Sequence, residues 1–288
     1  KKKNPLARFY MLVNNMLSKK IILEDSYNHE LYSLYTLFPR SSKLYIKSNN
    51  ITKDLVVYGS NLESTLTLPK YTSIISYMVN IPNNILYILT GLILSDGHIN
   101  NISKGNKSIK GLNTTANSKF YIKQSIKHSE YLIYIYTLLC HYCTSPPKLK
   151  KAYLKGKLFY ALEFYTRSLP CFTLLRNKFY LKRTKIMPKD IYDLLNYESI
   201  AHIIMCNGYF QKGGGIVLNL QNFTLTELIY FINILYIKFN LDCTLHKSRN
   251  KYLVYIKVAS VKKLYKEIEQ FIVPSMKYKF YKNLYDYQ

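Results

Sequence analysis

Two apolar segments with helical spacing dominate the hydrophobic pattern, at residues 89–97 and 200–208, and each ends in a polar residue followed by glycine. In the first segment the small residues Thr90 and Gly91 would let the backbone of another helix approach closely. The second segment repeats the run and has His202 in register with Gly91. The repeat predicts two similar helices that pack against each other.

The two segments differ in the polar residue at their ends. Asp96 precedes Gly97, whereas Asn207 stands at the equivalent place before Gly208. The carboxyl end of a helix disfavours negative charge, so Asp96 indicates a nearby cation. A buried aspartate that caps the following turn is the alternative. We also expect Gly97 to leave the helix in a left-handed conformation.

Alternation of apolar and polar residues predicts strands between these helices and further amphipathic helices. After the first segment the expected strands are residues 98–103, 117–125, 148–154 and 157–165, with helices at 129–142 and 172–180 and a basic connector at 180–190. After the second they are strands near 215–222, 243–246 and 252–258, with helices at 226–239 and from 260 onward. Glycines 213–215 lack the lysine and helix of a phosphate-binding loop and predict a flexible turn.

The net charge of the chain indicates what kind of molecule it binds. Lys and Arg number 41 against 16 Asp and Glu, a formal net charge of +25, and 48% of residues are hydrophobic. Such a chain can build a core and is suited to a polyanion, with nucleic acid the leading candidate. An anionic membrane surface is the competitor, but no uncharged apolar run approaches the roughly 20 residues of a spanning helix. Thirty tyrosines, no tryptophan and many lysines fit an A+T-rich organellar coding sequence.

The first 80 residues lack the pattern of the rest. They start at a lysine and include an amphipathic stretch at 6–17, for which a helix is a plainer interpretation than a signal peptide. We expect a mainly helical accessory arm, with a loosely held remnant as the alternative. The five cysteines include a lone C-x-x-C at Cys140 and Cys143 without a second pair, and we expect reduced packing thiols.

The two motifs and their flanks, among them residues 186–188, 215–228, 238–241 and 274–279, resemble the LAGLIDADG homing endonucleases and the group I intron maturases related to them. The resemblance is to the two-motif monomeric branch and covers about residues 82–284. It implies an α+β fold with two pseudo-symmetric αββαββα halves, whose antiparallel sheets form a saddle over nucleic acid. The expected domains are an N-terminal extension at 1–80 and halves at 81–188 and 189–288.

The resemblance also implies a site. Related endonucleases bind Mg²⁺ with one acid from each motif helix, so Asp96 would be a vestigial catalytic acid and weak metal ligand, and Asn207 would replace the second acid. Lys185 and Lys279 resemble the supporting lysines of the family. The lysines expected to contact phosphates lie on predicted strands or turns; they are Lys119, Lys123, Lys148, Lys150, Lys151, Lys155, Lys157, Lys247 and Lys251.

The leading hypothesis is an RNA maturase that binds a group I intron and stabilises its splicing-competent fold, as a monomer in the mitochondrial matrix. Mg²⁺ would then enter with the RNA, and a further splicing protein is a conceivable partner. An endonuclease that cuts or nicks double-stranded DNA is the alternative, and a structural nucleic-acid-binding subunit is a third class. Interleaved tyrosines, such as Tyr121, Tyr153, Tyr160 and Tyr165, would stack on unpaired bases or fill the core.

Overall fold

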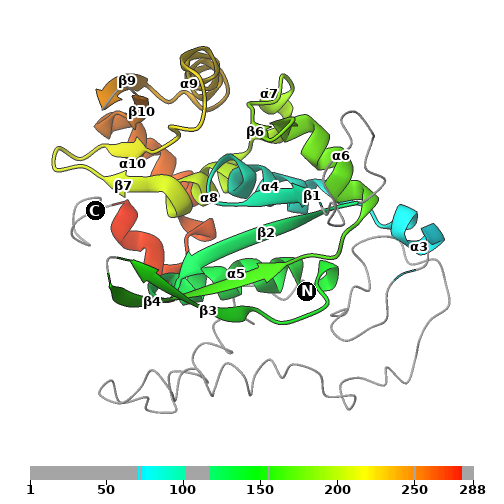
Figure 1. Ribbon diagram of the computed structural model, residues 1–288. Helices are drawn as coiled ribbons and strands as arrows, with labels where there is room; N and C mark the ends of the chain where they lie inside the picture. Colours follow the sequence, from blue (N-terminus) through cyan, green and yellow to red (C-terminus); the bar gives the residue numbers. More distant parts are fainter. Residues whose placement is uncertain (1–70, 72, 102–116, 155, 249–250, 281–288) are drawn as a thin grey trace, which may run out of the picture. The chain divides into compact units, whose positions relative to one another are not determined.

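The computed structural model describes residues 71, 73–101, 117–154, 156–248 and 251–280 (Figure 1). The expected arm at residues 1–80 therefore lies almost entirely outside the described residues, as does Lys155, and only the backbone of Lys157 is described. Of that arm the structure describes Tyr71 and one short helix, α3 (Ser73–Met78).

Two parts of the chain have the same order of helices and strands. The first half comprises α4 (Asn83–Leu94), β1 (His98–Asn101), β2 (Ser118–Ser125), α5 (Ser129–Leu139), β3 (Lys148–Leu154), β4 (Lys157–Tyr165) and α6 (Pro170–Phe179). The second half comprises α8 (Tyr197–Asn207), β7 (Gly208–Phe210), β8 (Ile216–Leu218), α9 (Leu225–Phe239), β9 (Cys243–Ser248), β10 (Lys251–Ile256) and α10 (Val258–Ile268). Both halves have the predicted αββαββα order.

The sheets repeat as well. Their strand orders are β1-β2-β4-β3 and β7-β8-β10-β9, so corresponding strands hold corresponding places, and the pairs with a described register are antiparallel. The α+β class with two similar antiparallel sheets is thus confirmed.

Contacts among the described residues group them into two compact units, one with Tyr71, 121–154 and 156–167 and the other with 73–101, 117–120, 168–248 and 251–280. In the first unit α5 covers one face of β2, β4 and β3 (Figure 1). Between the helix and the sheet the rings of Tyr136 and Phe164 meet edge to face, with their centroids 5.3 Å apart. In the second unit α9 packs on β9 and β10, with Phe231 and Leu235 buried. The division at residues 81–188 and 189–288 stays a prediction.

Local sequence signals explain where the helices begin and end. Asn196 and Ser199 form a reciprocal capping box at the start of α8, and Thr224 and Glu227 form another at the start of α9. Helix α9 ends at Asn240, which is in the left-handed conformation with φ 52°.

Three expectations need correction. Gly97 is not left-handed; it is a glycine because an added Cβ would lie 2.7 Å from the Phe120 ring and 2.8 Å from the carbonyl oxygen of Leu92. The connector at 180–190 contains a hairpin, β5 (Tyr180–Leu181) and β6 (Thr184–Lys185), and is followed by α7 (Ile191–Leu194). The second motif helix leads directly into β7, a strand before the one expected near 215–222.

Candidate functional site

Helices α4 and α8 contain the two motifs and pack closely against each other. A Cβ on Gly91 would lie 2.4 Å from the carbonyl oxygen of Ser199 and 2.9 Å from the Cβ of His202. The Ser199 hydroxyl also donates a 2.8 Å hydrogen bond to the carbonyl oxygen of Tyr87 across the interface. The predicted helix pair is therefore present, and the absence of a side chain at Gly91 is what allows the approach.

His202 belongs to this interface. Its side chain is fully buried opposite Gly91, as the matching positions in the two motifs predicted. Burial lowers the pKa of His202 to about 3, so the imidazole is neutral at physiological pH. The missing side chain at Gly91 explains how a large ring fits where the first motif has glycine.

Lys185 reaches from β6 to the end of the first motif. Its ammonium donates hydrogen bonds of 2.9 Å to the Ser95 carbonyl oxygen and 3.0 Å to the Gly97 carbonyl oxygen, and the residue is 8% exposed. Burial lowers the pKa of Lys185 to about 8, while the charges of Asp96 and Cys206 raise it in part. The amine thus satisfies carbonyl groups that follow the helix, where positive charge is favoured.

Lys279 does the same at the second motif, from the 3₁₀ segment η4 (Pro274–Lys279). Its ammonium donates to the carbonyl oxygens of Met205 at 2.6 Å and Cys206 at 2.9 Å. Burial lowers the pKa of Lys279, against the charges of Cys206 and Asp96. Asp96 therefore acts electrostatically on both buried lysines, which places the ends of the two motif helices close together.

The first motif end also includes His98 at the start of β1. Partial burial of its ring and the charge of Lys185 lower the pKa of His98, whereas the charge of Asp96 raises it. This histidine is exposed and so accessible to a bound molecule next to the carboxylate.

These residues do not by themselves make a magnesium site. Within the described ranges, no three His, Cys, Asp or Glu side chains are placed to share a metal ion. The carbonyl oxygens of Ser95 and Gly97 already accept from Lys185, which leaves the Asp96 carboxylate and the neutral amide of Asn207. Mg²⁺ is usually held by one or two carboxylates together with waters and substrate phosphates, and of these the motif ends supply one carboxylate, that of Asp96.

The lysines of the first sheet divide between its two faces. Strand register places Lys119, Lys123, Lys148 and Lys150 on the face opposite α5, together with Glu163. Lys151 lies opposite Tyr160 on the other face, with its amine 6.0 Å from the ring centroid. Four of the predicted lysines are therefore on one basic surface, and Lys151 is not part of it.

The second sheet has fewer cations on its outer face. Tyr255, His246 and Lys251 share the face opposite α9, with the His246 and Tyr255 rings stacked at 4.8 Å. Lys247 pairs with Tyr252 and so lies on the other face. This surface offers aromatic and neutral polar groups more than charge.

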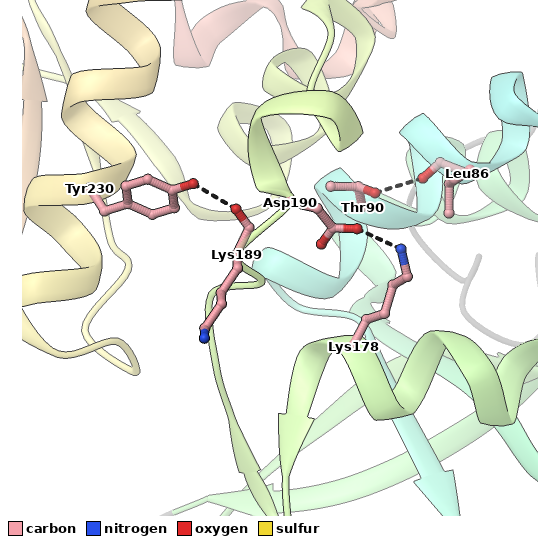
Figure 2. A network of polar contacts seen from close by, with 6 residues as sticks. All are labelled: Leu86, Thr90, Lys178, Lys189, Asp190 and Tyr230. Atoms are coloured by element: carbon pink, nitrogen blue, oxygen red, sulfur yellow. Dashed lines mark hydrogen bonds and ion pairs between the residues drawn. The ribbon is translucent and has the colours of Figure 1, made fainter.

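Side-chain contacts also hold the segment between the halves, as Figure 2 shows. Lys178 of α6 pairs with Asp190 at 2.5 Å, and the Tyr230 hydroxyl of α9 donates to the Lys189 carbonyl oxygen at 2.7 Å. Within α4, the Thr90 hydroxyl donates a 2.8 Å hydrogen bond to the Leu86 carbonyl oxygen one turn earlier. The connector that carries Lys185 is therefore tied to helices on both of its sides.

Sequence reasoning missed Glu163, which is the acidic residue of the basic surface and only 5% exposed. Its alternation with Tyr165 along β4 was the available signal.

Residues 86–264 match the model of the LAGLIDADG DNA endonuclease family. The chain belongs to this family.

Curated relatives have two kinds of name. The cytochrome b mRNA maturase bI2 of Debaryomyces hansenii is 31% identical over 73% of this chain and 78% of that protein. The protein of the same name from Saccharomyces cerevisiae is 29% identical over 68% of this chain, which spans only 47% of that relative. The probable intron-encoded endonuclease 1 of Wickerhamomyces canadensis is 30% identical over 68% of this chain and 83% of that protein.

Among solved structures, the homing endonuclease I-WcaI bound to its DNA recognition sequence matches with a TM-score of 0.66 and 24% identity, over 78% of this chain and all of that one. At this identity the match supports the fold. No helix in the described part of the chain is both long and apolar enough to cross a membrane.

Proposed function

We propose that this protein is an RNA maturase that binds a group I intron and stabilises the fold in which the RNA splices itself. The observation that carries the proposal is Asn207, a neutral amide at the place where the first motif has Asp96. The protein nevertheless has the motif helix pair, Lys185 and Lys279 at the ends of the two motifs, and the basic surface of the first sheet. Loss of the acid is tolerated if binding is the retained task.

The chemistry assigned to each part follows from its charge. Phosphates would bind at the basic surface, where each neutralised phosphate releases counterions. Mg²⁺ would enter with the folded RNA, because Asn207 leaves the two motif ends with one carboxylate, that of Asp96. Two relatives named as cytochrome b mRNA maturases support an intron in a mitochondrial transcript, and hence a mitochondrial location. The repeated halves support a monomeric pseudo-dimer.

A splicing assay tests the proposal. A precursor RNA with a group I intron in the cytochrome b coding sequence is incubated at low Mg²⁺ with and without protein. We expect faster splicing with wild-type protein and the same acceleration with Asp96→Asn. A double variant Lys123→Ala and Lys148→Ala should lose the acceleration at moderate salt, since two phosphate contacts are removed. Equal splicing rates with and without wild-type protein would reject the maturase function.

The retained carboxylate favours a second candidate, a DNA endonuclease reduced to nicking. Asp96 could still serve one strand if the scissile phosphate supplied further metal ligands, and the family and one relative are named for this activity. A supercoiled plasmid with the joined exons should stay intact with wild-type protein under the maturase proposal. Nicking that is lost in Asp96→Asn would establish the endonuclease instead.

A further inference from the structure

Two tyrosines form a pair on the basic surface of the first sheet. Tyr121 of β2 lies directly opposite Tyr165 of β4, on the face away from α5. Their rings are stacked, with centroids 5.5 Å apart and planes 18° from parallel. Strand tyrosines often fill a core, but these two are only partly buried and point to the polar side. The rings are therefore aligned before any ligand binds.

A single carboxylate holds this pair. The Tyr165 hydroxyl donates to one oxygen of Glu163 at 2.5 Å and the Tyr121 hydroxyl donates to the other at 3.0 Å, while the Lys150 amine lies 3.4 Å from the first oxygen. Burial would raise the pKa of Glu163, but these three partners bring it below the ordinary value. Burial and Glu163 together raise the pKa of each tyrosine to about 12, so both hydroxyls stay protonated donors.

Cations surround the pair. Lys123 and Lys148 flank Glu163 on the two neighbouring strands, and the Lys148 amine lies 5.7 Å from the centroid of the Tyr165 ring. The Lys150 ammonium offsets the negative charge of the carboxylate, and Lys123 and Lys148 on the neighbouring strands make the surface around it basic. The surface combines rigid aromatic faces with several cations a few ångströms away.

We propose that Tyr121, Tyr165 and Glu163 form a stacking platform for an unpaired base of single-stranded or looped RNA, with the adjacent phosphates on Lys123 and Lys148. Glu163 is a positioning residue that keeps the rings aligned. In a duplex both faces of each base are covered by its neighbours, so the platform can act only on an unpaired nucleotide. This inference rests on the proposed RNA binding and names the kind of nucleotide recognised.

The test compares two probes on the full chain: a short single-stranded RNA that contains 2-aminopurine, and a duplex DNA of mixed sequence. Wild-type protein should quench the 2-aminopurine fluorescence on binding. Tyr121→Leu should weaken binding of the RNA about 5- to 150-fold, the value of one base–aromatic stack, and remove the quenching. Affinity for the duplex and the salt dependence should not change, because no charge is lost.

Controls separate stacking from folding and from charge. Tyr121→Phe keeps the ring but loses its hydrogen bond to Glu163, so its quenching should lie between that of wild type and that of Tyr121→Leu. Tyr153→Leu removes a tyrosine that is 74% exposed on the opposite face of the sheet and should change nothing. Lys148→Ala should weaken the binding of both probes. For the RNA it should also reduce the slope of log affinity against log salt concentration by about 0.7. Equal loss of RNA and duplex binding in Tyr121→Leu, or unchanged quenching, would overturn the platform.

The outcomes also distinguish this inference from the maturase function. Accelerated splicing by wild-type protein and by Tyr121→Leu alike, with no quenching, would overturn the platform and leave the maturase standing. Quenching that depends on Tyr121 without any acceleration of splicing would support the platform and reject the maturase.

Discussion

Substitution of Gly91 by alanine tests the close approach of the two motif helices. The new methyl carbon would lie 2.4 Å from the Ser199 carbonyl oxygen and 2.9 Å from the Cβ of His202. Neither atom is the flexible end of a side chain, so the helices must move apart. Overpacking of this kind costs about 3 kcal/mol at the upper end of its usual range, and alanine recovers about 1 kcal/mol of helix propensity. We expect a net loss of about 2 kcal/mol in the free energy of unfolding.

The matched control is Gly213→Ala in the turn between β7 and β8. An added Cβ there meets nothing within 4 Å, and the residue does not have a left-handed φ. Its effect should stay within about 0.5 kcal/mol. Urea unfolding of the three proteins, followed by far-UV circular dichroism with the slopes compared, measures both values. If Gly91→Ala proved as stable as Gly213→Ala, the geometry of the helix pair described here would be refuted.

Three further predictions concern single groups. Because burial depresses the folded-state pKa of Lys185 from 10.5 to about 8, the group's contribution to stability is present above pH 10.5 and lost as the pH falls towards 8. Between pH 8 and 10 the unfolding free energy of wild type should therefore rise by about 2 kcal/mol relative to Lys185→Met, and parallel curves would contradict the assigned burial. Glu198 has its pKa raised from 4.5 to about 7 by burial, so stability is lost as the pH rises from 4.5 to 7. Glu198→Gln should be more stable than wild type by about 2 kcal/mol at pH 8 after allowance for partial exposure, with no difference at pH 4; a difference independent of pH would contradict the reasoning. Thr224→Ala removes the cap of α9, whose hydroxyl accepts from the Glu227 amide at 3.3 Å, and should cost about 1 kcal/mol. The exposed Thr226→Ala is the control for thermal unfolding, and equal melting temperatures would reject the capping role.

Much of the fold could be predicted because its signals are local. The bounds expected for β3 and β4 were exact, since each strand has enough residues for alternation to be visible. The spacing of Thr224 and Glu227 is that of a capping box and places the start of α9. In contrast, β5 and β6 have two residues each, too few for any periodic signal, and the hairpin was not predicted.

The candidate site was predicted by residue type more than by role. Lys185 and Lys279 were expected as supporting lysines of the site, but the sequence could not show that their amines bind backbone carbonyl groups. Those contacts join residues 74 to 90 positions apart in the chain. Glu163 was missed for a similar reason, because its tie to Tyr121 depends on the pairing of β2 with β4.

By itself the sequence determined the repeat, the order of the longer helices and strands, the strongly basic charge and the presence of Asn207 at the place where the first motif has Asp96. The first three follow from periodicity and composition, and the last from alignment of the two motifs. Only the tertiary structure decided that Gly91 lies against Ser199 and His202, that Lys151 is on the other face from Lys148, and that Glu163 aligns two tyrosines. Each of these depends on strand register or helix contact between distant segments, where packing and the pairing of polar groups select one arrangement among many with the same local pattern.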